Sequence, residues 1–554
     1  AGFVDVPTVT GYAASLPNVV HAEYNLYTCS QDSIHHITEV IQEQGLNRVV
    51  VASCSPLTHA PLFQDSLRAA GLNPYLFAMA NIRNHCSWVH SDDRQAATRK
   101  AQELVRMAVA RAALLQPQTT VEVPLQKAAL VVGGGPAGLT AALTLADGGF
   151  PVFLVEREQQ LGGNLRQVYL PMPGDSGDPQ EILNHLVERV RNNERISLHL
   201  GAEVLHSTGF VGNFSTTIQL PAGQRIEIAH GVTILATGAQ EYRGAEYGYG
   251  SHPKILTQLE FERFLSGAAK QDLPQRVAMI LCIGPAEKYC SRICCAVALK
   301  NALALKKRKP EAEVVVLYRD LRAYGFKERW YTTAREQGVL FIRYQPDRPP
   351  QVLTNEAELV LRTWDYQLER ALELRPDLLV LSMPAVPPAG AHQLATLFRV
   401  PVDADGFFQE VHVKLRPVDF ATDGIFMAGN AHYPKMLDET IVQAQAAAAR
   451  AARVLSRQAI QGGGRVAVVE SERCIGCLTC VRICPFQIPR IRADLSGAGG
   501  ILGAAYIEPS VCQGCGLCAA ECPARAIQLM HYTDIQMRAE VQALIRTEAV
   551  STPP

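Results

Sequence analysis

The sequence lacks several features that mark whole classes of protein. It has no excess of charge of either sign, because 52 Lys and Arg nearly balance 53 Asp and Glu, for a net charge of -1. This balance argues against nucleic acid or an anionic membrane surface as a partner. No purely apolar run reaches the 18 or so residues that a transmembrane helix needs, so we predict no membrane span.

The chain also shows no secretory signal pattern, and it starts at Ala1 rather than Met, so we expect it to be the remainder of a longer protein. Its 15 cysteines fall mostly into groups with metal-ligand spacing. That distribution favours a reducing, cytoplasmic location over secretion. At 554 residues, the chain is long enough for about three or four domains.

What the sequence does contain, near its C-terminus, is a doubled cysteine frame of the form C-x2-C-x2-C-x3-C-P. In this frame three thiolates bind one iron–sulfur cube and the fourth reaches the other cube. A zinc site or a disulfide framework would not require a doubled frame with a proline after each last cysteine. We therefore predict two 4Fe–4S clusters and single-electron chemistry. The predicted ligands are Cys474, Cys477, Cys480 and Cys522 for one cluster, and Cys512, Cys515, Cys518 and Cys484 for the other.

A dinucleotide-binding motif, G-x-G-x-x-G, follows a predicted strand over residues 127–132. A helix and a second strand come next, and that strand ends at Glu156, 18 residues past Gly138. Glycines at these positions bring a helix N-terminus against a pyrophosphate, and the carboxylate can accept hydrogen bonds from ribose hydroxyls. The complete arrangement favours a bound dinucleotide over an ordinary glycine-rich turn. Its predicted contacts are Gly133, Gly135, Pro136, Ala137, Gly138 and Glu156.

Three further segments favour FAD over NAD as the occupant, because they resemble flavoproteins that bind two dinucleotides. Their predicted contacts are Gly162, Gly163 and Asn164, then Thr237 and Gly238, then Gly429 and Asn430. Flavoproteins of this kind usually carry an Asp after the last glycine, so Asn430 would offer the ribityl chain a neutral amide instead. His432 and Lys435 could hydrogen-bond the flavin ring; a loop-capping histidine and a solvated lysine are the alternatives.

A flavoprotein that resembles thioredoxin reductase is expected to carry a second glycine loop, for NAD(P)H. The expected strand (276–282), helix (291–307) and next strand (314–318) are present, but the loop is not G-x-G-x-x-G. A helix N-terminus lowers thiolate pKa values and favours anionic clusters. We therefore predict a third cluster, with a redox disulfide or inert buried thiols as alternatives. The predicted ligands are Cys282, Cys290, Cys294 and Cys295.

Several segments along the chain resemble the A subunit of heterodisulfide reductase, an iron–sulfur flavoprotein. They are residues 46–56, 73–90, 289–295, 430–435 and 438–441. The resemblance implies an oxidoreductase component that contains FAD and 4Fe–4S clusters. Such a protein takes electrons from a hydrogenase, formate dehydrogenase or NADH dehydrogenase module and passes them to ferredoxin and a heterodisulfide-reducing partner. Electron bifurcation and a homodimer within a larger complex are further expectations of the resemblance.

The sequence departs from this resemblance in three places. No cysteine lies between Asn164 and Ala236, so the inserted ferredoxin domain of the methanogen forms is absent and the chain resembles a bacterial type. The gap from Cys282 to Cys290 is shorter than the usual spacing. The upstream C-x-C-G segment is not in this sequence. We interpret the dispersed thiols as structural, with a further cluster as the alternative; they are Cys29, Cys54 and Cys86.

Two other functions stay open at this point. One is a flavin and iron–sulfur relay in a membrane quinone-linked complex of sulfur metabolism. The other is an NAD(P)H-dependent flavoprotein similar to the smaller protein of glutamate synthase, although the chain lacks that protein's second glycine loop. We also expect heterodisulfide reduction itself to occur on another protein of the complex, because no cysteine-rich catalytic repeat accompanies the electron-relay frames.

The predicted fold is α/β. It comprises a small N-terminal α/β domain (1–118), an FAD-binding Rossmann-like domain in two pieces (122–272 and 388–460), a degenerate nucleotide-binding-like domain with a cluster (273–387) and an α+β ferredoxin domain (461–554). We predict helices over 32–44 and 96–115 and a strand over 47–52 in the first domain. The glycine run at 461–465 is predicted to be a flexible hinge, and the helix over 534–547 is expected to dock on a partner.

Overall fold

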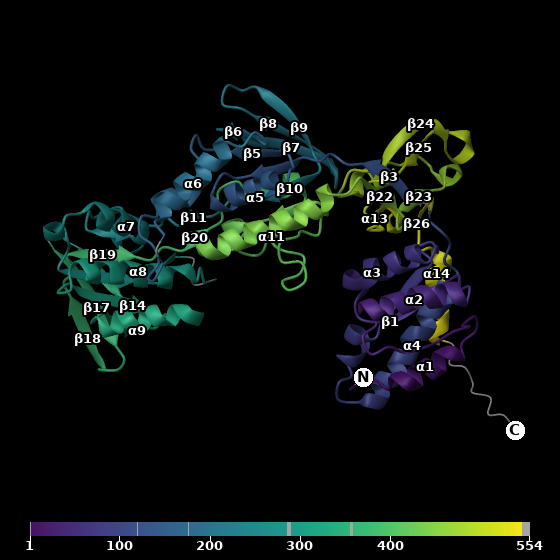
Figure 1. The fold of residues 1–554 in the computed structure, drawn as a ribbon, viewed down its shortest axis with the longest axis horizontal. Helices are drawn as coiled ribbons and strands as arrows, with labels where there is room; N and C mark the ends of the chain where they lie inside the picture. Colours follow the sequence, from purple (N-terminus) through teal and green to yellow (C-terminus); the bar gives the residue numbers. More distant parts are fainter. Residues whose placement is uncertain (1, 119, 176, 285–289, 355–357, 546–554) are drawn as a thin grey trace. The chain divides into compact units, whose positions relative to one another are not determined.

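The chain forms two compact units (Figure 1), one from Ala1–Val123 with Ile460–Pro554 and the other from Pro124–Ala459. The computed structural model describes residues 2–118, 120–175, 177–284, 290–354 and 358–545. The unit boundaries lie beside the predicted linkers. The N-terminal and ferredoxin domains, which the sequence treats separately, belong to one unit.

The larger unit begins with a five-stranded parallel sheet in the order β21-β10-β4-β5-β6. All residues of β4 and β10 are buried, because helices α5, α6 and α11 cover one face of the sheet and strands β7, β8 and β9 pack on the other. An antiparallel sheet, β7-β8-β9, lies beside it in sequence. The bounds are β4 Ala129–Val132, α5 Pro136–Asp147, β5 Val152–Glu156, α6 Pro179–Arg191, β6 Ile196–Leu200, β7 Glu203–Phe210, β8 Asn213–Gln219, β9 Arg225–His230, β10 Val232–Leu235, β21 Ile425–Met427 and α11 Leu437–Leu455.

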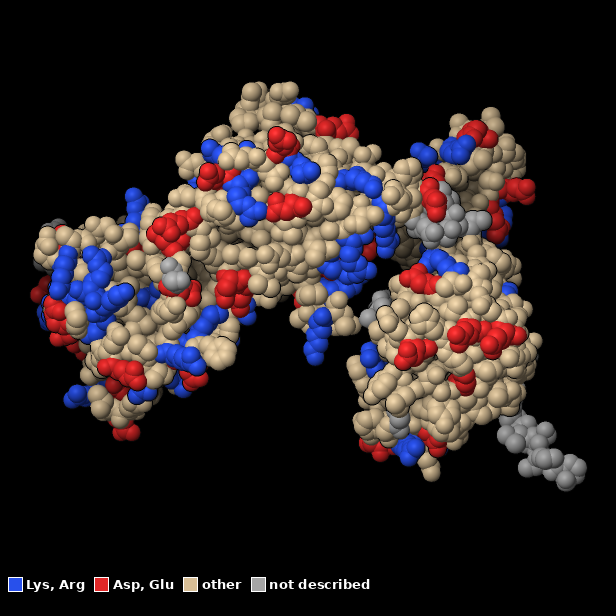
Figure 2. Space-filling view, viewed as in Figure 1, with Lys and Arg blue, Asp and Glu red and all other residues tan. Residues whose placement is uncertain are grey.

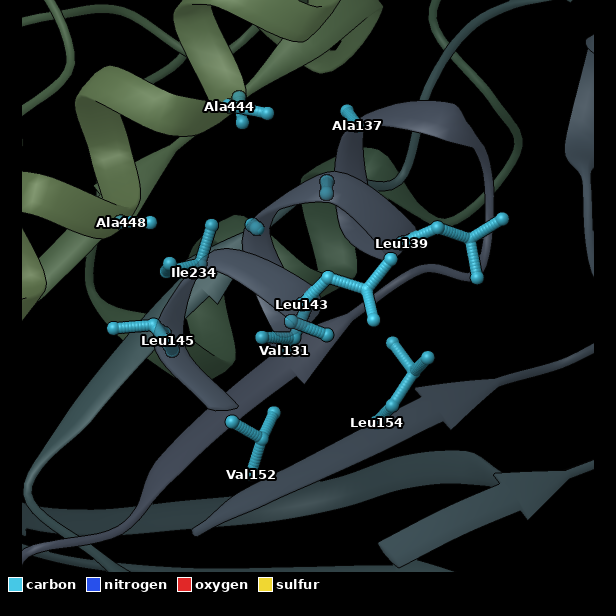
Figure 3. Packing of buried hydrophobic residues seen from close by; sticks show 14 of the residues in the cluster. Val131, Ala137, Leu139, Leu143, Leu145, Val152, Leu154, Ile234, Ala444 and Ala448 are labelled. Carbon is cyan, nitrogen blue, oxygen red and sulfur yellow. The ribbon is translucent and has the colours of Figure 1, made fainter. Parts of the chain in front are cut away.

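The core of this sheet consists of branched residues on the strands and small residues on the helices. Figure 3 shows Leu139 and Leu143 of α5 packed over the strands, with Ala444 and Ala448 of α11 facing α5. Alanine at these positions lets the two helices approach closely. This packing fixes the start of each helix relative to the ends of the strands, where ligands bind in such sheets.

A second parallel sheet of the same unit has the order β12-β19-β13-β14-β15. Its first β–α–β element was predicted, and the structure confirms it. The bounds are β11 Gln240–Glu241, β12 Ile255–Thr257, α7 Gln258–Gly267, β13 Arg276–Ile280, α8 Ile293–Arg308, β14 Glu313–Tyr318, α9 Glu328–Glu336, β15 Leu340–Arg343, β16 Gln351–Thr354, β17 Leu359–Asp365, β18 Arg370–Leu374, β19 Leu378–Leu381, β20 Ala385–Val386 and α10 Ala391–Phe398. Two parallel sheets with β–α–β connections in one unit confirm the predicted α/β class.

The described N-terminal part of the smaller unit contains a parallel pair of strands, β1 and β2, with four α-helices and one short π-helix. The three elements predicted here are confirmed to within a few residues. The bounds are α1 Val6–Ala14, α2 Gln31–Glu43, β1 Val49–Ser53, α3 Pro56–Ala69, β2 Phe77–Asn81, a π-helix Arg83–Ser87, α4 Arg94–Ala112 and β3 Thr120–Pro124.

The ferredoxin part of the same unit has two short antiparallel strand pairs, β23-β26 and β24-β25. Their inward residues pack with the buried cysteines of the doubled frame. The bounds are β22 Ala459–Gly463, β23 Ala467–Val469, α12 Thr479–Ile483, β24 Arg490–Ser496, β25 Leu502–Tyr506, α13 Leu517–Ala520, β26 Ile527–Leu529 and α14 Asp534–Ile545.

Helix α14, which we expect to dock on a partner, packs on α4 of its own unit. Arg106 Nε donates to the Ala543 carbonyl at 2.7 Å, and Gln536 Nε2 donates to the Leu114 carbonyl at 3.1 Å. The guanidinium of Arg111 lies over the Tyr532 ring, 5.0 Å from its centroid. These side chains satisfy carbonyls that each helix leaves free at its C-terminus.

The glycine run that we predict to be a flexible hinge adjoins the boundary between the two units, and part of it is packed. The last glycine of the run, Gly464, has φ +83° and a Cβ there would lie 1.9 Å from the ring of Tyr75. The Tyr75 hydroxyl donates to the Gly463 carbonyl at 3.4 Å, and strand β22 pairs with β3. Glycine at 464 therefore allows a left-handed backbone and a close aromatic contact.

Basic and acidic side chains alternate over the face of the protein shown in Figure 2, in line with the near-zero net charge. No helix in the part of the chain that the structure describes is both long and apolar enough to cross a membrane.

Candidate functional site

The first glycine loop joins β4 to α5, and its three glycines have different roles. A Cβ at Gly133, where φ is +113°, would lie 2.3 Å from the Ala236 carbonyl oxygen, and a Cβ at Gly138 would lie 1.8 Å from the Gly133 oxygen. These two glycines allow backbone to pack on backbone. A Cβ at Gly135 would meet no heavy atom of the described protein within 4 Å. Gly135 therefore faces the open side of the loop, where a pyrophosphate can approach the N-terminus of α5.

Glu156, at the end of β5, is buried beneath this loop and is 8% exposed. Its carboxylate accepts hydrogen bonds from the backbone N–H groups of Gly134 and Glu158. Each carboxylate oxygen can accept a further hydrogen bond. The side chain can thus hold the glycine loop and still receive a ribose hydroxyl, as predicted.

The second glycine pair lies directly against the first loop. The Gly162 N–H donates to the Gly134 carbonyl at 2.7 Å, and a Cβ at Gly163 would lie 3.3 Å from Gly135 Cα. Asn164 Nδ2 donates to the Ala239 carbonyl at 2.7 Å, which ties this segment to the one after β10. The predicted contact residues of three separate segments therefore meet in one place.

Thr237, in the segment after β10, supplies a polar atom suited to a ligand. Its Oγ1 is buried and has no hydrogen-bond partner among the described residues. The following Gly238 has φ +71°, and a Cβ there would meet no described heavy atom within 4 Å. An unsatisfied buried hydroxyl beside open backbone is the arrangement expected where a polar cofactor completes the site.

The loop between β21 and α11 meets the same site. A Cβ at Gly429 would lie 2.6 Å from the Ala137 Cβ, and the Gly429 N–H donates to Gln443 Oε1 at 2.9 Å. The side-chain oxygen of Asn430 accepts from the Lys435 N–H at 2.9 Å. All the predicted dinucleotide contacts therefore surround the N-terminus of α5, and their glycine cradle and unpaired Thr237 hydroxyl fit FAD.

His432 is buried, 6% exposed, and held from both sides. Its Nε2 lies 2.8 Å from Glu410 Oε2, and its Nδ1 lies 2.7 Å from Gln443 Nε2. Burial lowers the pKa of His432, and the charge of Lys435 lowers it further, against the opposite effect of Glu410. Gln443 connects the histidine to the Gly429 loop.

Lys435 is buried as well, at 5% exposure, so it is not the solvated lysine of the alternative interpretation. Its Nζ donates to the carbonyls of Gly429 and Tyr433, both at 3.0 Å. Burial lowers the pKa of Lys435 to about 7, and the positive charge of Arg292 acts in the same direction. A buried cation whose charge changes near neutral pH therefore lies on the Gly429 loop.

The second loop joins β13 to α8 and holds the four thiols. Cys282 follows β13 with φ +63°, whereas Cys294 and Cys295 lie in the first turn of α8. Cys290 Sγ accepts a hydrogen bond from the Arg292 N–H at 3.3 Å. The intervening residues 285–289, including Tyr289 of the family-like segment, lie outside the described residues.

The four thiols of this loop influence one another electrostatically. Burial raises the pKa of Cys294, and negative charges on Cys295, Cys290 and Cys282 raise it further. Burial likewise raises the pKa of Cys295 to about 12. Such mutually repelling thiols can all be deprotonated only when a cationic centre compensates them, and metal binding does this. The donor set thus fits an iron–sulfur cluster.

The doubled frame of the ferredoxin part brings the predicted ligand sets together across the two runs. The lining of one cavity includes Cys474, Cys477, Cys480 and Cys522, the first predicted set. Burial raises the pKa of Cys518 to about 12, and negative charges on Cys512, Cys515 and Cys484, the second predicted set, add to this. Ligand roles stay predictions at all three sites.

Backbone N–H groups point at the sulfurs of both thiol regions. The Ala505 N–H donates to Cys474 Sγ at 3.3 Å and the Ala526 N–H to Cys522 Sγ at 3.3 Å, as the Arg292 N–H does to Cys290. Hydrogen bonds to sulfur stabilise the thiolate and tune a bound cluster. Among the described residues, no group of three or more His, Cys, Asp or Glu side chains is arranged so that it could bind a single metal ion.

The dispersed thiols of the N-terminal part have different surroundings. Cys86 is fully buried, and its Sγ donates to the Ala97 carbonyl at 2.8 Å. Cys29 is exposed and Cys54 is half-buried. The contact of Cys86 supports a structural role for that residue.

Sequence reasoning missed the polar residues that hold the site together. Glu439, in the first turn of α11, accepts from the Met436 N–H and from the Tyr324 hydroxyl, and Gln443 and Glu410 hold His432. An acidic residue three positions after a helix start is a capping pattern, and this signal could have identified Glu439. The sequence gives no comparable signal for Glu410, which comes from a distant loop.

Comparison with known proteins defines the class of this site. The family described as FAD dependent oxidoreductase matches residues 129–229, and the family described as 4Fe-4S dicluster domain matches residues 473–526. The chain is thus an FAD-dependent oxidoreductase with 4Fe–4S clusters, which confirms both cofactor predictions.

Relatives over nearly the full length narrow this class. The chain is 36% identical to the A subunit of the H(2):CoB-CoM heterodisulfide,ferredoxin reductase of Methanothermobacter marburgensis, with 88% of each chain covered. It is 33% identical to an iron-sulfur A subunit of the CoB--CoM heterodisulfide reductase of Methanopyrus kandleri, over 98% of this chain and 95% of the relative. The chain belongs to the family of heterodisulfide reductase A subunits, as the sequence motifs predict.

Among solved structures, the thioredoxin reductase of Lactococcus lactis is similar to this chain, and the match covers 59% of this chain and 98% of the reductase. Its TM-score is 0.43 and its identity is 17%.

Proposed function

We propose that this chain receives electron pairs at FAD and releases them one at a time through three 4Fe–4S clusters within a heterodisulfide reductase-like complex. FAD supplies the exchange between two-electron and one-electron chemistry when it is bound. The observation that supports this role most directly is the gathering of four thiols in the second loop, where a flavoprotein that uses pyridine nucleotides needs a glycine loop. In this proposal electrons, rather than a hydride from bound NAD(P)H, pass through the second sheet.

The residues around the flavin position would bind and tune it. Gly135 and the N-terminus of α5 would receive the pyrophosphate, and Glu156 the ribose. Lys435 places a positive charge on the Gly429 loop, and the N-terminus of α11 adds to the positive potential there. Both would favour a reduced, anionic flavin over the oxidised form. His432 would share this role through its contact with Gln443.

Partners follow from the relatives by analogy. The name of the Methanothermobacter relative includes hydrogen, a CoB-CoM heterodisulfide and ferredoxin. We accordingly propose a hydrogenase, formate dehydrogenase or NADH dehydrogenase module as donor, with ferredoxin and a heterodisulfide-reducing protein as acceptors. The two-cluster ferredoxin part would be an outlet toward these acceptors, and splitting of each electron pair between them would be bifurcation.

Stopped-flow mixing of the anaerobic holoprotein with NADH or NADPH tests the lost nucleotide site. The flavin absorbance is expected to stay unbleached without partner proteins, whereas dithionite bleaches it. Rapid bleaching by either nucleotide would contradict the proposal and favour the NAD(P)H-dependent alternative. A Gly135→Ala variant changes only the first loop and shows the absorbance signal expected when FAD loading is poor. Comparison with this variant distinguishes poor FAD loading from a lack of reactivity with NADH or NADPH.

A further inference from the structure

Arg292 connects the thiol loop to the flavin-facing end of α11. It lies between Cys290 and Cys294, at the start of α8, and has φ +48°. Its Nη2 lies 3.2 and 3.3 Å from the two carboxylate oxygens of Glu439, and its Nε donates to the Pro434 carbonyl at 3.3 Å. Its backbone N–H donates to Cys290 Sγ. One residue thus touches a candidate cluster ligand and the first turn of the flavin helix.

Two tyrosines enclose the same guanidinium group. The Arg292 Cζ lies 5.3 Å from the centroid of the Tyr324 ring and 4.9 Å from that of Tyr433. The Tyr324 hydroxyl donates to Glu439 at 2.8 Å, so the charge pair and the aromatic contacts form one network. Lys435 Nζ lies 3.4 Å from the Tyr433 centroid, which continues the network to the Gly429 loop.

The geometry depends on the shape of arginine as well as on its charge. A planar guanidinium can reach both oxygens of a carboxylate, donate to a carbonyl and contact aromatic faces at the same time, whereas an ammonium group cannot. The left-handed backbone at Arg292 is uncommon for a residue other than glycine. A position that accepts this strain and makes these contacts suggests a constraint beyond surface solubility.

We propose that Arg292 is a positioning residue that holds the thiol loop against the N-terminus of α11, and thereby sets the electron-transfer contact between the third cluster and FAD. This inference rests on the proposed third cluster. It adds that the distance and orientation of the two redox centres depend on the Arg292–Glu439 clamp.

The test uses the full-length anaerobic holoprotein and measures the rate at which electrons equilibrate between flavin and clusters after photoreduction, by transient absorption. Arg292→Lys keeps the charge but loses the shape. Glu439→Gln touches no cysteine and keeps an acceptor at the helix cap, since Gln serves there as Glu does. Because small misplacements of reacting groups cost large factors in rate, we expect both variants to slow equilibration by about tenfold to a hundredfold.

Arg322→Ala is the matched control. The Arg322 side chain is exposed and donates to Asp320 at 3.1 Å, and the charge of Cys290 contributes to its raised pKa. The substitution therefore removes a positive charge near the same thiols without touching α11. The control is expected to keep the wild-type rate, which separates positioning from a simple charge effect.

The outcomes separate this inference from the proposed function. If the wild type holds only about eight irons per FAD, the count for two cubes, the third cluster and this inference both fail. If the wild type and Glu439→Gln both hold about 12 irons per FAD and equilibrate at the same rate, the inference alone is overturned. If Arg292→Lys loses iron, its rate cannot be compared with that of the wild type, and the equilibration rate of Glu439→Gln alone tests the inference. Equal slowing in Arg322→Ala would also overturn it, because charge alone would then explain the effect.

Discussion

The two parallel sheets of the larger unit share one local geometry, a strand followed by a loop and a helix, but their loops carry glycines in one case and cysteines in the other. Each has a buried strand, a connecting loop and a helix that begins where the loop ends. In the first, glycines such as Gly135 leave space for a ligand; in the second, Cys294 and Cys295 occupy the first helical turn. The helix dipole favours an anion at both places, whether phosphate or a cluster with its thiolates. From this comparison we propose that the residues of the loop decide whether such an element binds a nucleotide or a metal cluster.

The largest expected effect is in the glycine loop. Gly138→Ala would place a Cβ 1.8 Å from the Gly133 carbonyl oxygen, so the start of α5 must move. We expect destabilisation of about 3 kcal/mol, the upper range for overpacking, together with loss of FAD. Thermal unfolding and flavin content measure both effects. Gly135→Ala is the matched control: no described atom lies near its Cβ, so it is expected to lose FAD affinity while the FAD-free protein keeps its melting temperature.

The next largest effect is expected in the cysteine loop, where a substitution should remove one cluster and leave the flavin in place. Cys294→Ser removes one proposed ligand and is expected to lower the iron content from about 12 to about 8 per FAD, without loss of flavin. Anaerobic iron and flavin quantitation checks this, with Cys29→Ser as the control that keeps all iron. Unchanged iron in Cys294→Ser would contradict a ligand role and favour the disulfide or inert-thiol alternatives.

The smallest expected effect concerns the flavin potential. Lys435→Met removes a positive charge from the Gly429 loop and is expected to lower the FAD midpoint potential by about 30 mV, a tenfold change in equilibrium for a two-electron couple. Because burial and Arg292 lower the pKa of Lys435 to about 7, its charge is lost as pH rises through that value. The difference between wild type and variant is therefore expected to be largest near pH 6 and to shrink above pH 8. Spectroelectrochemical titrations at several pH values measure it, and a pH-independent difference would contradict this account.

The sequence predicted the elements whose signals are local. The strands and helices around both loops follow from buried apolar runs and glycine or cysteine spacing, and the ligand sets of the doubled frame follow from its known cross-ligation. The docking of α14 on α4 could not be predicted, because an amphipathic helix does not specify which surface covers it. The contact of the glycine run with Tyr75, almost 400 residues away in sequence, could not be predicted for a related reason, because a glycine does not indicate which side chain packs against it. Glu410 and Arg292 act through partners from distant loops, which no local pattern reveals.

The iron-to-flavin ratio of anaerobically purified wild-type protein tests the central claim most directly, because it asks whether the second loop holds metal. Three cubes and one flavin predict about 12 irons per FAD. A ratio of about 8 irons per FAD, with full flavin occupancy, would contradict a cluster at Cys282, Cys290, Cys294 and Cys295.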